Sequence, residues 1–360
     1  MDADVLDQTV QKRPFYDIDD AVWHRRRNEK MMEMNIHQNM RAVVIYVAGG
    51  VEQLKLKEVP IPQVKPGWSL VRIRSFGVNR SEIFTRRGYS PSVEFPRILG
   101  IECTGLIAAS TDEKRLPVGQ KVISIMGEMG RAFDGSYAQY TLLPDTQIYP
   151  VQTELSWEDL AAVVETGYTA YGSLMNMHLS SDAKILIRGA TSGTGITALK
   201  MIRGKYPHAS VTGSTRKKEK EEMLKRAGFD EVIVDLDGKL QSDEKFDRVL
   251  DLIGPAALKD TFCHTVCGGI VCSTGELGGQ WTMDDFDPIM DIPDGAMLTS
   301  FYSGSVTAER MQKMLDFVRK YQVDLHPEKV FYGLEQVADA HRYLEGKRSF
   351  GKTVVRLQDE

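Results

Sequence analysis

The stretch Gly189-Ala190-Thr191-Ser192-Gly193-Thr194-Gly195 decides the fold, because it joins the apolar run 185–187 to a helix predicted over residues 196–202. A short glycine-rich turn between a strand and a helix lets backbone N–H groups approach a pyrophosphate, which the positive helix N-terminus then stabilises. Ala190 and Ser192 replace the first two glycines of the usual G-x-G-x-x-G spacing, and Gly195 keeps the third. The alternative is a purely structural glycine turn, but the flanking strand and helix favour a dinucleotide site.

Strands and helices alternate around this loop. Apolar strands are predicted at 185–187, 210–212, 232–234, 249–252 and 269–272, with helices around 195–204 and 217–227. Such alternation predicts a parallel sheet with right-handed crossovers. From Arg41 to about residue 143, short β-rich runs separated by proline and glycine instead predict a compact β-rich domain. Residues 1–40 are polar and charged, and we interpret them as an N-terminal extension without chemistry of its own.

The residues that end the second strand bear on the choice of cofactor. An NAD enzyme normally places Asp or Glu there, about 20 residues past the loop, to bind the adenosine ribose hydroxyls. This chain has Ser214-Thr215-Arg216-Lys217-Lys218 instead. Three adjacent cations favour a 2′-phosphate and hence NADPH, with Ser214, Arg216 and Lys217 as its contacts. The alternative is a solvated helix start, although cations are mildly unfavourable at a helix N-terminus.

Composition excludes several other classes of function. A formal net charge of −5 and a pI near 5.9 give no concentrated basic surface for nucleic acid or for an anionic membrane. The four cysteines are too few for a disulfide framework, which favours a reducing compartment. No apolar run reaches the roughly 18 residues that span a bilayer, and the start lacks the apolar stretch of a signal peptide. We therefore expect a soluble, cytoplasmic protein.

A set of motifs in fixed order extends over most of the chain. They are Gly77-Val78-Asn79-Arg80-Ser81-Glu82, Gly88-Tyr89, Pro96-Arg97-Ile98-Leu99-Gly100-Ile101-Glu102, Val118-Gly119-Gln120-Lys121-Val122, Gly135-Ser136-Tyr137-Ala138, the loop at 189–195 and Gly351-Lys352. From about Arg41 to Leu357 the chain thereby resembles the medium-chain dehydrogenase/reductase superfamily, and within it the quinone oxidoreductase branch that includes zeta-crystallin-like proteins.

This resemblance implies an α/β architecture of two domains. A GroES-like, β-rich catalytic domain would comprise residues 41–165 and 306–360, and a Rossmann domain with a doubly wound parallel sheet would comprise 166–305. Where zinc alcohol dehydrogenases carry a cysteine ligand this chain has Asn79, and where they carry Gly-His-Glu it has Gly100-Ile101-Glu102. Neither Asn79 nor Ile101 can supply a thiolate or an imidazole to zinc, so we expect no metal. Cys263, His264, Cys267 and Cys272 match no common metal site, and we expect them to be structural.

The resemblance also implies roles for individual residues. Asn79, Tyr89 and Thr169 are the candidate catalytic residues, with Tyr89 as the hydrogen-bond donor to the substrate oxygen or, alternatively, as an aromatic gate. The family often shows a tyrosine where this chain has Phe84. For Arg80 and Glu82 a local ion pair is expected. The full set of expected cofactor contacts is Asn79, Thr166, Thr169, Tyr171, Ala190, Thr191, Ser192, Gly193, Thr194, Gly195, Ser214, Arg216, Lys217, Gly254, Gly275, Gly351 and Lys352.

These features lead to one principal hypothesis and two alternatives. The principal one is an NADPH-dependent reductase that delivers a hydride to a quinone or to the activated C=C bond of an α,β-unsaturated carbonyl, which needs no Lewis acid. The first alternative is an enoyl reductase that acts on thioesters bound to a carrier protein, and the second is a low-turnover NADPH-binding protein. A homodimer is expected, because two-fold assemblies are the commonest homo-oligomers.

Overall fold

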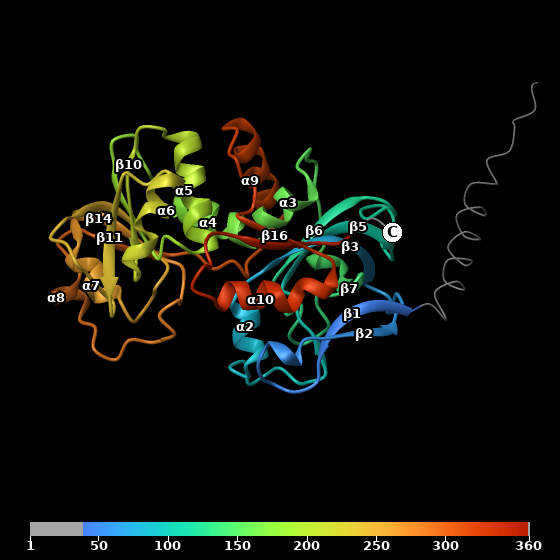
Figure 1. Cartoon of the computed structure of the whole chain (residues 1–360). Helices are drawn as coiled ribbons and strands as arrows, with labels where there is room; N and C mark the ends of the chain where they lie inside the picture. The colour runs from blue at the N-terminus through green and yellow to red at the C-terminus, as the bar shows by residue number, and fades with distance from the viewer. Residues whose placement is uncertain (1–38, 359–360) are drawn as a thin grey trace, which may run out of the picture. The chain divides into compact units, whose positions relative to one another are not determined.

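Two sheets, antiparallel except for the parallel pair β16 and β17, make up the β-rich part of the chain. The computed structural model describes residues 39–358, so most of the predicted extension lies outside the described residues. β1 (Asn39–Ile45) pairs with β2 (Lys55–Pro60) and β4 (Arg97–Ile98) in a three-stranded sheet. The second sheet has the order β16 (Lys329–Tyr332), β17 (Thr353–Arg356), β3 (Trp68–Val78), β5 (Glu102–Ala109), β6 (Lys121–Ile125) and β8 (Tyr149–Pro150), with β7 (Tyr140–Pro144) also paired to β3. The β-rich domain predicted from the sequence is therefore confirmed (Figure 1).

The third sheet carries the glycine loop. Its strands run in the order β12 (Lys239–Leu240), β11 (Glu231–Leu236), β10 (Ser210–Thr215), β9 (Lys184–Arg188), β13 (Phe246–Asp251), β14 (Thr265–Ser273) and β15 (Met297–Ser300). All neighbours pair in parallel except β12, which is antiparallel to β11. From β11 to β15 this is the 3-2-1-4-5-6 order of a doubly wound dinucleotide-binding sheet. The predicted parallel sheet is confirmed.

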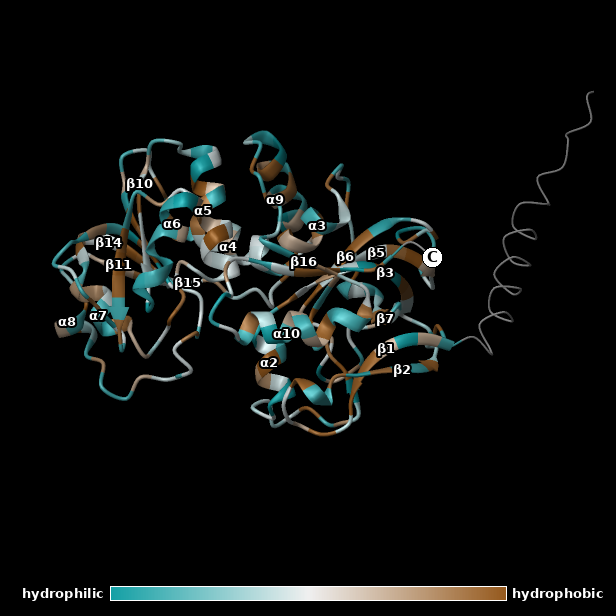
Figure 2. Cartoon of the chain, in the orientation of Figure 1, coloured by the Kyte–Doolittle hydropathy of each residue, from teal (hydrophilic) through white to brown (hydrophobic). Residues whose placement is uncertain are grey.

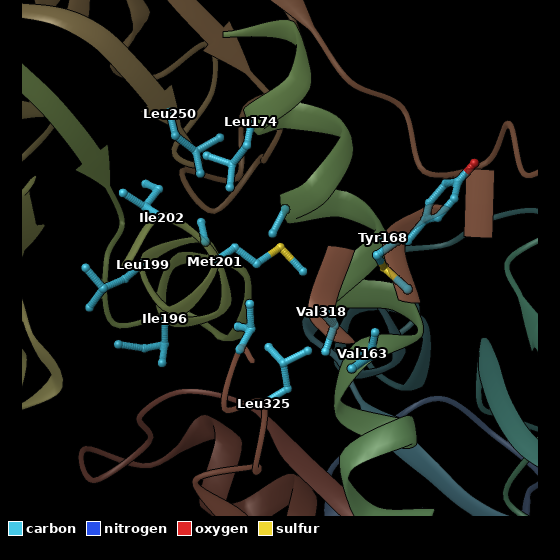
Figure 3. Close-up of a cluster of buried hydrophobic side chains, with 14 of the residues drawn as sticks. Val163, Tyr168, Leu174, Ile196, Leu199, Met201, Ile202, Leu250, Val318 and Leu325 are labelled. Atoms are coloured by element: carbon cyan, nitrogen blue, oxygen red, sulfur yellow. The ribbon is translucent and has the colours of Figure 1, made fainter. Parts of the chain in front are cut away.

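Alternate residues of β9 bury opposite faces of this sheet. Ile185 and Ile187 belong to a core that includes side chains from α4 (Glu165–Asn176), α5 (Gly193–Lys205) and α9 (Ala308–Lys320). Leu186 points the other way and packs with residues of α7 (Leu258–Cys263). Figure 3 shows the first core, where Met201 of α5 points toward α4 and Leu199 and Ile202 lie on the opposite side of α5, and the hydropathy colouring of Figure 2 shows a brown stretch along β11. Helices therefore cover both faces, as expected for strands that are apolar throughout.

Three other helices surround the ends of β3 and β17. α2 (Arg80–Arg86) begins directly after β3, α3 (Trp157–Val163) precedes α4 along the chain, and α10 (Val337–Glu345) leads through a short turn to β17. β17 pairs with β3 in an antiparallel register that sets Thr353 opposite Val78. The residues just before β17 and just after β3 therefore lie at the same end of the sheet, which brings Lys352 to Asn79.

Candidate functional site

The glycine loop has the geometry of an anion-binding turn. Ser192 is the N-cap of α5, and its Oγ accepts a hydrogen bond from the backbone N–H of Gly195 at 3.1 Å. A Cβ atom on Gly195 would lie 2.8 Å from the carbonyl oxygen of Ala190, so the turn has no room for a side chain there. The 13-residue helix has no acidic residue in its first turn. Its positive end is therefore unneutralised, and the loop fits a dinucleotide pyrophosphate.

Residues 351 and 352 lie against this loop although they are about 160 positions away in the sequence. The backbone N–H of Gly351 donates to the carbonyl of Thr191 at 3.1 Å, and Gly351 forms an isolated β-bridge with Ser192. The backbone N–H of Lys352 donates to Oε2 of Glu328 at 2.7 Å. A Cβ on Gly193 would lie 3.5 Å from Cα of Lys352. The structure thus brings together residues that the resemblance assigned to one cofactor site.

Asn79 is held by a buried ionic network that reaches both sides of the site. Its Oδ1 accepts from Lys352 Nζ at 2.7 Å, and its Nδ2 donates to Oε1 of Glu102 at 2.8 Å. Lys352 and Glu102 also form an ion pair of 2.7 Å, and both side chains are almost fully buried. The other carboxylate oxygen of Glu102 accepts from the backbone N–H of Glu165 at 2.8 Å. The orientation of the Asn79 amide is consequently fixed by two side chains, Lys352 and Glu102.

Glu82 completes the network and corrects one expectation. Its side chain accepts from the backbone N–H of Asn79 at 3.0 Å and from Asn79 Nδ2 at 3.3 Å. Glu82 therefore caps the start of α2, and Arg80 donates instead to the carbonyl of Leu344 at 3.4 Å. The expected Arg80–Glu82 ion pair is not formed, because the carboxylate turns back toward the orphan N–H groups of the helix start. Both N–H groups of the Asn79 amide are engaged by carboxylates, so Asn79 serves here as an acceptor and an orienting group.

Two further carboxyl groups, Glu82 and Glu165, lie near the Lys352–Glu102 pair, and burial raises the pKa of both. Burial, followed by the charge of Glu102, raises the pKa of Glu82 to about 7. Burial also raises the pKa of Glu165, with a further contribution from Glu102, while Lys352 acts in the opposite direction. A carboxyl group with a pKa near neutral pH, such as Glu82, is characteristic of functional sites.

The shift at Glu82 predicts a pH dependence of stability. The native state keeps the Glu82 proton up to about pH 7, whereas an ordinary glutamate releases it near 4.5. Stability should therefore fall as the pH rises between these two values. Glu82→Gln cannot titrate but keeps an oxygen acceptor for Asn79, so its urea-unfolding midpoint should fall less than that of the wild type from about pH 5 to about pH 8. Glu309→Gln, at an exposed carboxylate, should follow the wild type; identical curves for all three proteins would contradict the prediction.

The expected contacts from α4 divide into two groups. Thr169 lies beside the network, since its Oγ1 donates to Oε1 of Glu165 at 3.1 Å, and Thr166 lies on the same face with its Cγ2 3.2 Å from the Cβ position of Gly193. Tyr171 does not join them. Its ring lies 5.5 Å from that of Phe317 on α9, because two helical positions beyond Thr169 a side chain points to the opposite side. The structure thus supports a site on the face of Thr166 and Thr169.

The loops after β13 and β14 pack on each other where Gly254 and Gly275 were expected. Gly254 has a φ of +82°, and a Cβ on it would lie 2.5 Å from the carbonyl oxygen of Gly275. The first loop is fixed by Asp251, whose Oδ1 accepts from the N–H groups of Ile253 and Gly254 at 2.8 and 2.9 Å. The second is linked to α4 by a hydrogen bond of 2.9 Å between Thr274 and Ser173.

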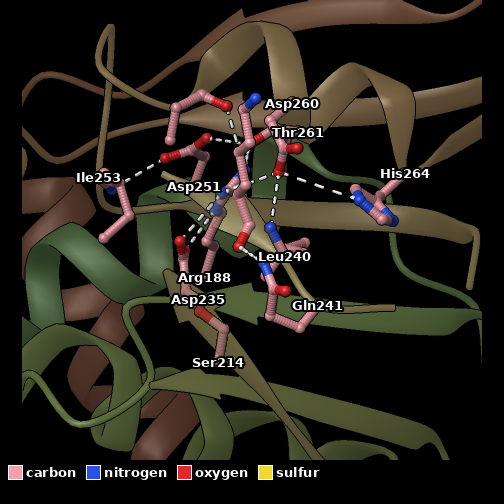
Figure 4. A network of polar contacts seen from close by, with 12 residues as sticks. Arg188, Ser214, Asp235, Leu240, Gln241, Asp251, Ile253, Asp260, Thr261 and His264 are labelled. Atoms are coloured by element: carbon pink, nitrogen blue, oxygen red, sulfur yellow. Dashed lines mark hydrogen bonds and ion pairs between the residues drawn. The ribbon is translucent and has the colours of Figure 1, made fainter. Parts of the chain in front are cut away.

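A buried arginine connects these loops to the strand that precedes the glycine loop. Figure 4 shows Arg188 at the centre of the network: Nε donates to Asp235 at 2.8 Å, Nη1 donates to Thr261 at 2.8 Å, and Nη2 pairs with Asp260 at 2.9 Å. Thr261 in turn donates to Asp251. Because Arg188 is fully buried and directly precedes Gly189, it fixes the carboxyl ends of β9 and β13 relative to each other.

Basic side chains lie close together at the end of β10. Besides the expected Arg216 and Lys217, they include Lys220 and Arg80. Arg216 is exposed and Lys217 half-buried, whereas Lys220 is buried and its Nζ donates to the carbonyl of Ser349. Burial and then the charges of Lys217 and Arg216 lower the pKa of Lys220, and burial and then Arg216 lower that of Arg80. Like charges held this close create a site for an anion. Lys220 could have been inferred from the sequence, because the cluster of basic residues that begins at Arg216 extends to residue 220. Arg80 could have been inferred because it directly follows Asn79.

Ser214 has a different position from the one expected of a phosphate contact. Its side chain is buried, and its Oγ accepts from the backbone N–H of Gly189 at 3.1 Å. Its carbonyl accepts from the N–H of Ala190, also at 3.1 Å. Ser214 therefore supports the glycine loop from the neighbouring strand, because the parallel pairing of β9 and β10 places it beside Gly189.

The structure also describes the surroundings of Tyr89 and of the positions where related zinc enzymes carry metal ligands. The Tyr89 side chain is 65% exposed, and its ring lies 6.3 Å from that of Phe84.

Ile101 is buried, and within residues 39–358 no group of three or more His, Cys, Asp or Glu side chains is arranged to hold a metal ion. Cys272 is buried in β14, while His264 Nδ1 lies 2.9 Å from the carbonyl oxygen of Glu244. In the same part of the chain, no helix has the length and apolar character needed to cross a membrane.

Known proteins with this architecture provide an independent comparison. Residues 65–153 match the family profile described as alcohol dehydrogenase GroES-like domain, and residues 227–355 match that described as zinc-binding dehydrogenase. The chain is 25% identical to the quinone oxidoreductase of Pongo abelii over 335 residues, covering 88% of this chain and 98% of the relative. It is 28% identical to prostaglandin reductase-3 of Mus musculus, covering 84% of each. The crystal structure of Bacillus subtilis yhfP, which has NAD bound, covers 89% of this chain and 100% of its own, with a TM-score of 0.77 and 23% identity.

Proposed function

Since the chain belongs to the medium-chain dehydrogenase/reductase superfamily, on its quinone oxidoreductase branch, we propose that it is an NADPH-dependent, zinc-independent reductase of quinones or of α,β-unsaturated carbonyls. One observation carries the proposal. The amide of Asn79, fixed by Lys352 and Glu102, lies where the glycine loop meets residues 351–352. A zinc enzyme of this superfamily would need a thiolate at that position.

The geometry supports the following assignment of residues to the cofactor. The loop of residues 190–195 and the N-terminus of α5 would hold the pyrophosphate, and Arg216, Lys217 and Lys220 would hold the 2′-phosphate. Thr166, Thr169, Gly254, Gly275, Gly351 and Lys352 would surround the nicotinamide half. The bound cofactor supplies a hydride, and the chain supplies its position and surroundings.

The residues at the positions of the zinc ligands, Asn79 and Ile101, favour a reaction that needs no Lewis acid. Alcohol oxidation needs a Lewis acid to stabilise an alkoxide, and the Asn79 amide and the Ile101 side chain offer no ligand for one. A quinone or an enone already contains an electron sink, so alignment and hydrogen-bond donors suffice. We assign the orientation of the substrate to Asn79 and Thr169, and the donor at the rim of the site to Tyr89.

A panel of acceptors tests this function directly. Oxidation of NADPH should accelerate with 1,4-naphthoquinone or a cyclic enone and should remain unchanged after dialysis against a strong chelator, because no step depends on a metal. The metal content should be well below one zinc per chain, and stoichiometric zinc that survives dialysis would contradict the assignment of Asn79 and Ile101. Activity confined to thioesters on a carrier protein would show the enoyl reductase instead, and tight NADPH binding without turnover would show a binding protein.

We also propose that the protein is a cytoplasmic homodimer. β15 forms one edge of the parallel sheet, and its Met297 and Leu298 are about half exposed, with Ile289 and Met290 of α8 (Pro288–Asp291) more exposed still. Such an edge pairs readily with a second copy of itself across a two-fold axis. All four cysteines are free thiols, which supports a reducing compartment.

A further inference from the structure

A group of three aromatic side chains lies beside the site, and two of them have no role in the function described so far. The aromatic cluster consists of Phe84, Tyr89 and Trp281. The Phe84 ring lies 6.3 Å from that of Tyr89 and 6.5 Å from that of Trp281, which it meets edge to face at 63°. Tyr89 is 65% exposed and Trp281 58% exposed. Large aromatic surface thus remains open to solvent at a point where three rings converge.

The cluster spans the same boundary as the cofactor residues. Phe84 belongs to α2, whose N-cap is Asn79, so it lies little more than one turn from the buried network. Trp281 belongs to the segment that follows β14, and this segment begins at Thr274, which is bonded to Ser173 of α4. One wall of the cluster therefore comes from the β-rich part and the other from the segment after β14.

The environment of Trp281 differs from that of the other described tryptophans. Trp68 packs edge to face on Phe133 at 5.2 Å, and the ring of Trp157 is covered by Lys121 Nζ at 4.8 Å. Trp281 has Phe84 at its edge, and more than half of its surface is uncovered. Exposed apolar surface of this kind beside a site indicates a ligand that covers it when bound.

We propose that Trp281 and Phe84, whose rings already meet edge to face, together form an aromatic clamp that covers one face of the acceptor and so selects planar, fused-ring acceptors over single-ring ones, with Tyr89 at its rim. Flat rings stack on aromatic faces or meet their edges favourably, and each added ring increases the area covered. The inference rests on the proposed function, since it specifies the class of acceptor. It predicts that affinity rises with the number of fused rings and that Trp281 is the principal cause.

Equilibrium binding of unreactive ligands tests the clamp without turnover. Phenol, 2-naphthol and 9-phenanthrol, titrated onto the full chain without cofactor, should bind the wild type with increasing affinity in that order. Trp281→Ala should weaken binding of 9-phenanthrol by about three- to tenfold, as expected for the loss of one aromatic contact, and phenol binding much less. Trp281→Phe should restore most of the loss. Tyr332→Ala, which removes an exposed aromatic side chain on β16, should bind all three ligands like the wild type.

The same variants in steady state separate this inference from the proposed function. With 1,4-benzoquinone, 1,4-naphthoquinone and 9,10-phenanthrenequinone, Trp281→Ala should lose the dependence of KM on ring number and retain the wild-type KM for NADPH. If Trp281→Ala binds the three alcohols with the wild-type order and affinities, the clamp is refuted even where quinones are reduced. If the ring preference depends on Trp281 but no quinone or enone is reduced, the clamp holds and the proposed reductase function fails.

Discussion

Replacing Lys352 by methionine is expected to destabilise the protein by about 3–5 kcal/mol, because it leaves the fully buried carboxylate of Glu102 without its cation. The two remaining donors to Glu102, from Asn79 and from the backbone of Glu165, are neutral groups that cannot replace the charge. Urea unfolding, analysed with one m-value for the wild type and the variant, measures the loss in the free energy of unfolding. The same substitution should release the Asn79 amide and so lower activity.

Two further variants show whether the loss arises from the ion pair. Adding Glu102→Gln to Lys352→Met removes the uncompensated charge, so the double variant should recover much of the lost stability. Lys184→Met removes a lysine from an ion pair with Glu244 in which both side chains are exposed by more than 40%, and it should cost less than about 1 kcal/mol. A double variant that is no more stable than Lys352→Met alone would show that packing of the lysine stem, and not its charge, stabilises this site.

The double substitution Arg216→Ala and Lys217→Ala is expected to weaken NADPH binding by about ten- to hundredfold while changing NADH binding little. A hydrogen bond to a charged group contributes about 1.5–3 kcal/mol, and each 1.4 kcal/mol is a factor of ten. The two contacts will not simply multiply, because they share one phosphate. Titration by cofactor fluorescence gives both dissociation constants, and kcat should change little because the hydride is transferred at the other end of the cofactor.

A second double variant, which removes the same number of positive charges elsewhere, separates direct contact with the 2′-phosphate from the effect of net charge on cofactor binding. Lys225→Ala with Arg226→Ala removes two cations from the last turn of α6 (Glu221–Ala227) and should leave the NADPH/NADH ratio unchanged. Added salt should weaken NADPH binding more than NADH binding in the wild type, because the contacts are partly exposed. If the Arg216/Lys217 variant keeps the wild-type ratio, the cations are a solvated helix start and the proposed choice of NADPH is wrong.

The sequence predicted the parts of the fold that depend on local pattern. The alternation of apolar strands and helices after Lys184 was sufficient for the parallel sheet, because such strands are buried on both faces. The glycine loop was recognisable because its conformation depends on residues next to each other in the chain. Element ends were less well defined: the helix expected around 217–227 consists of a 3-10 turn at 218–220 followed by α6 at 221–227.

Side-chain placement within the site depends on contacts that local pattern does not contain. Ser214 was expected at the phosphate, yet the register of β10 against β9 buries it under Gly189. Tyr171 was grouped with Thr166 and Thr169 because the family resemblance implied it, whereas helical rotation directs it to Phe317. Glu165 and Trp281 were not expected at all, because each acquires its role from a partner more than 60 residues away.

The pairing of β17 with β3 has a consequence for how this protein is made. The ribosome completes β3, Asn79 and Glu102 long before residues 351–356 are synthesised. Glu102 can therefore pair with Lys352 only after some 250 further residues have been translated. Pairing between strands so distant in sequence is slow, and edges left open in the meantime are prone to aggregation. Nascent chains stalled before Gly351 would contain the complete glycine loop but lack the residues that close against it. Nucleotide binding is therefore a late event in the synthesis of this protein. A chaperone that binds the nascent chain until residue 351 is made would protect the open strand edges from aggregation.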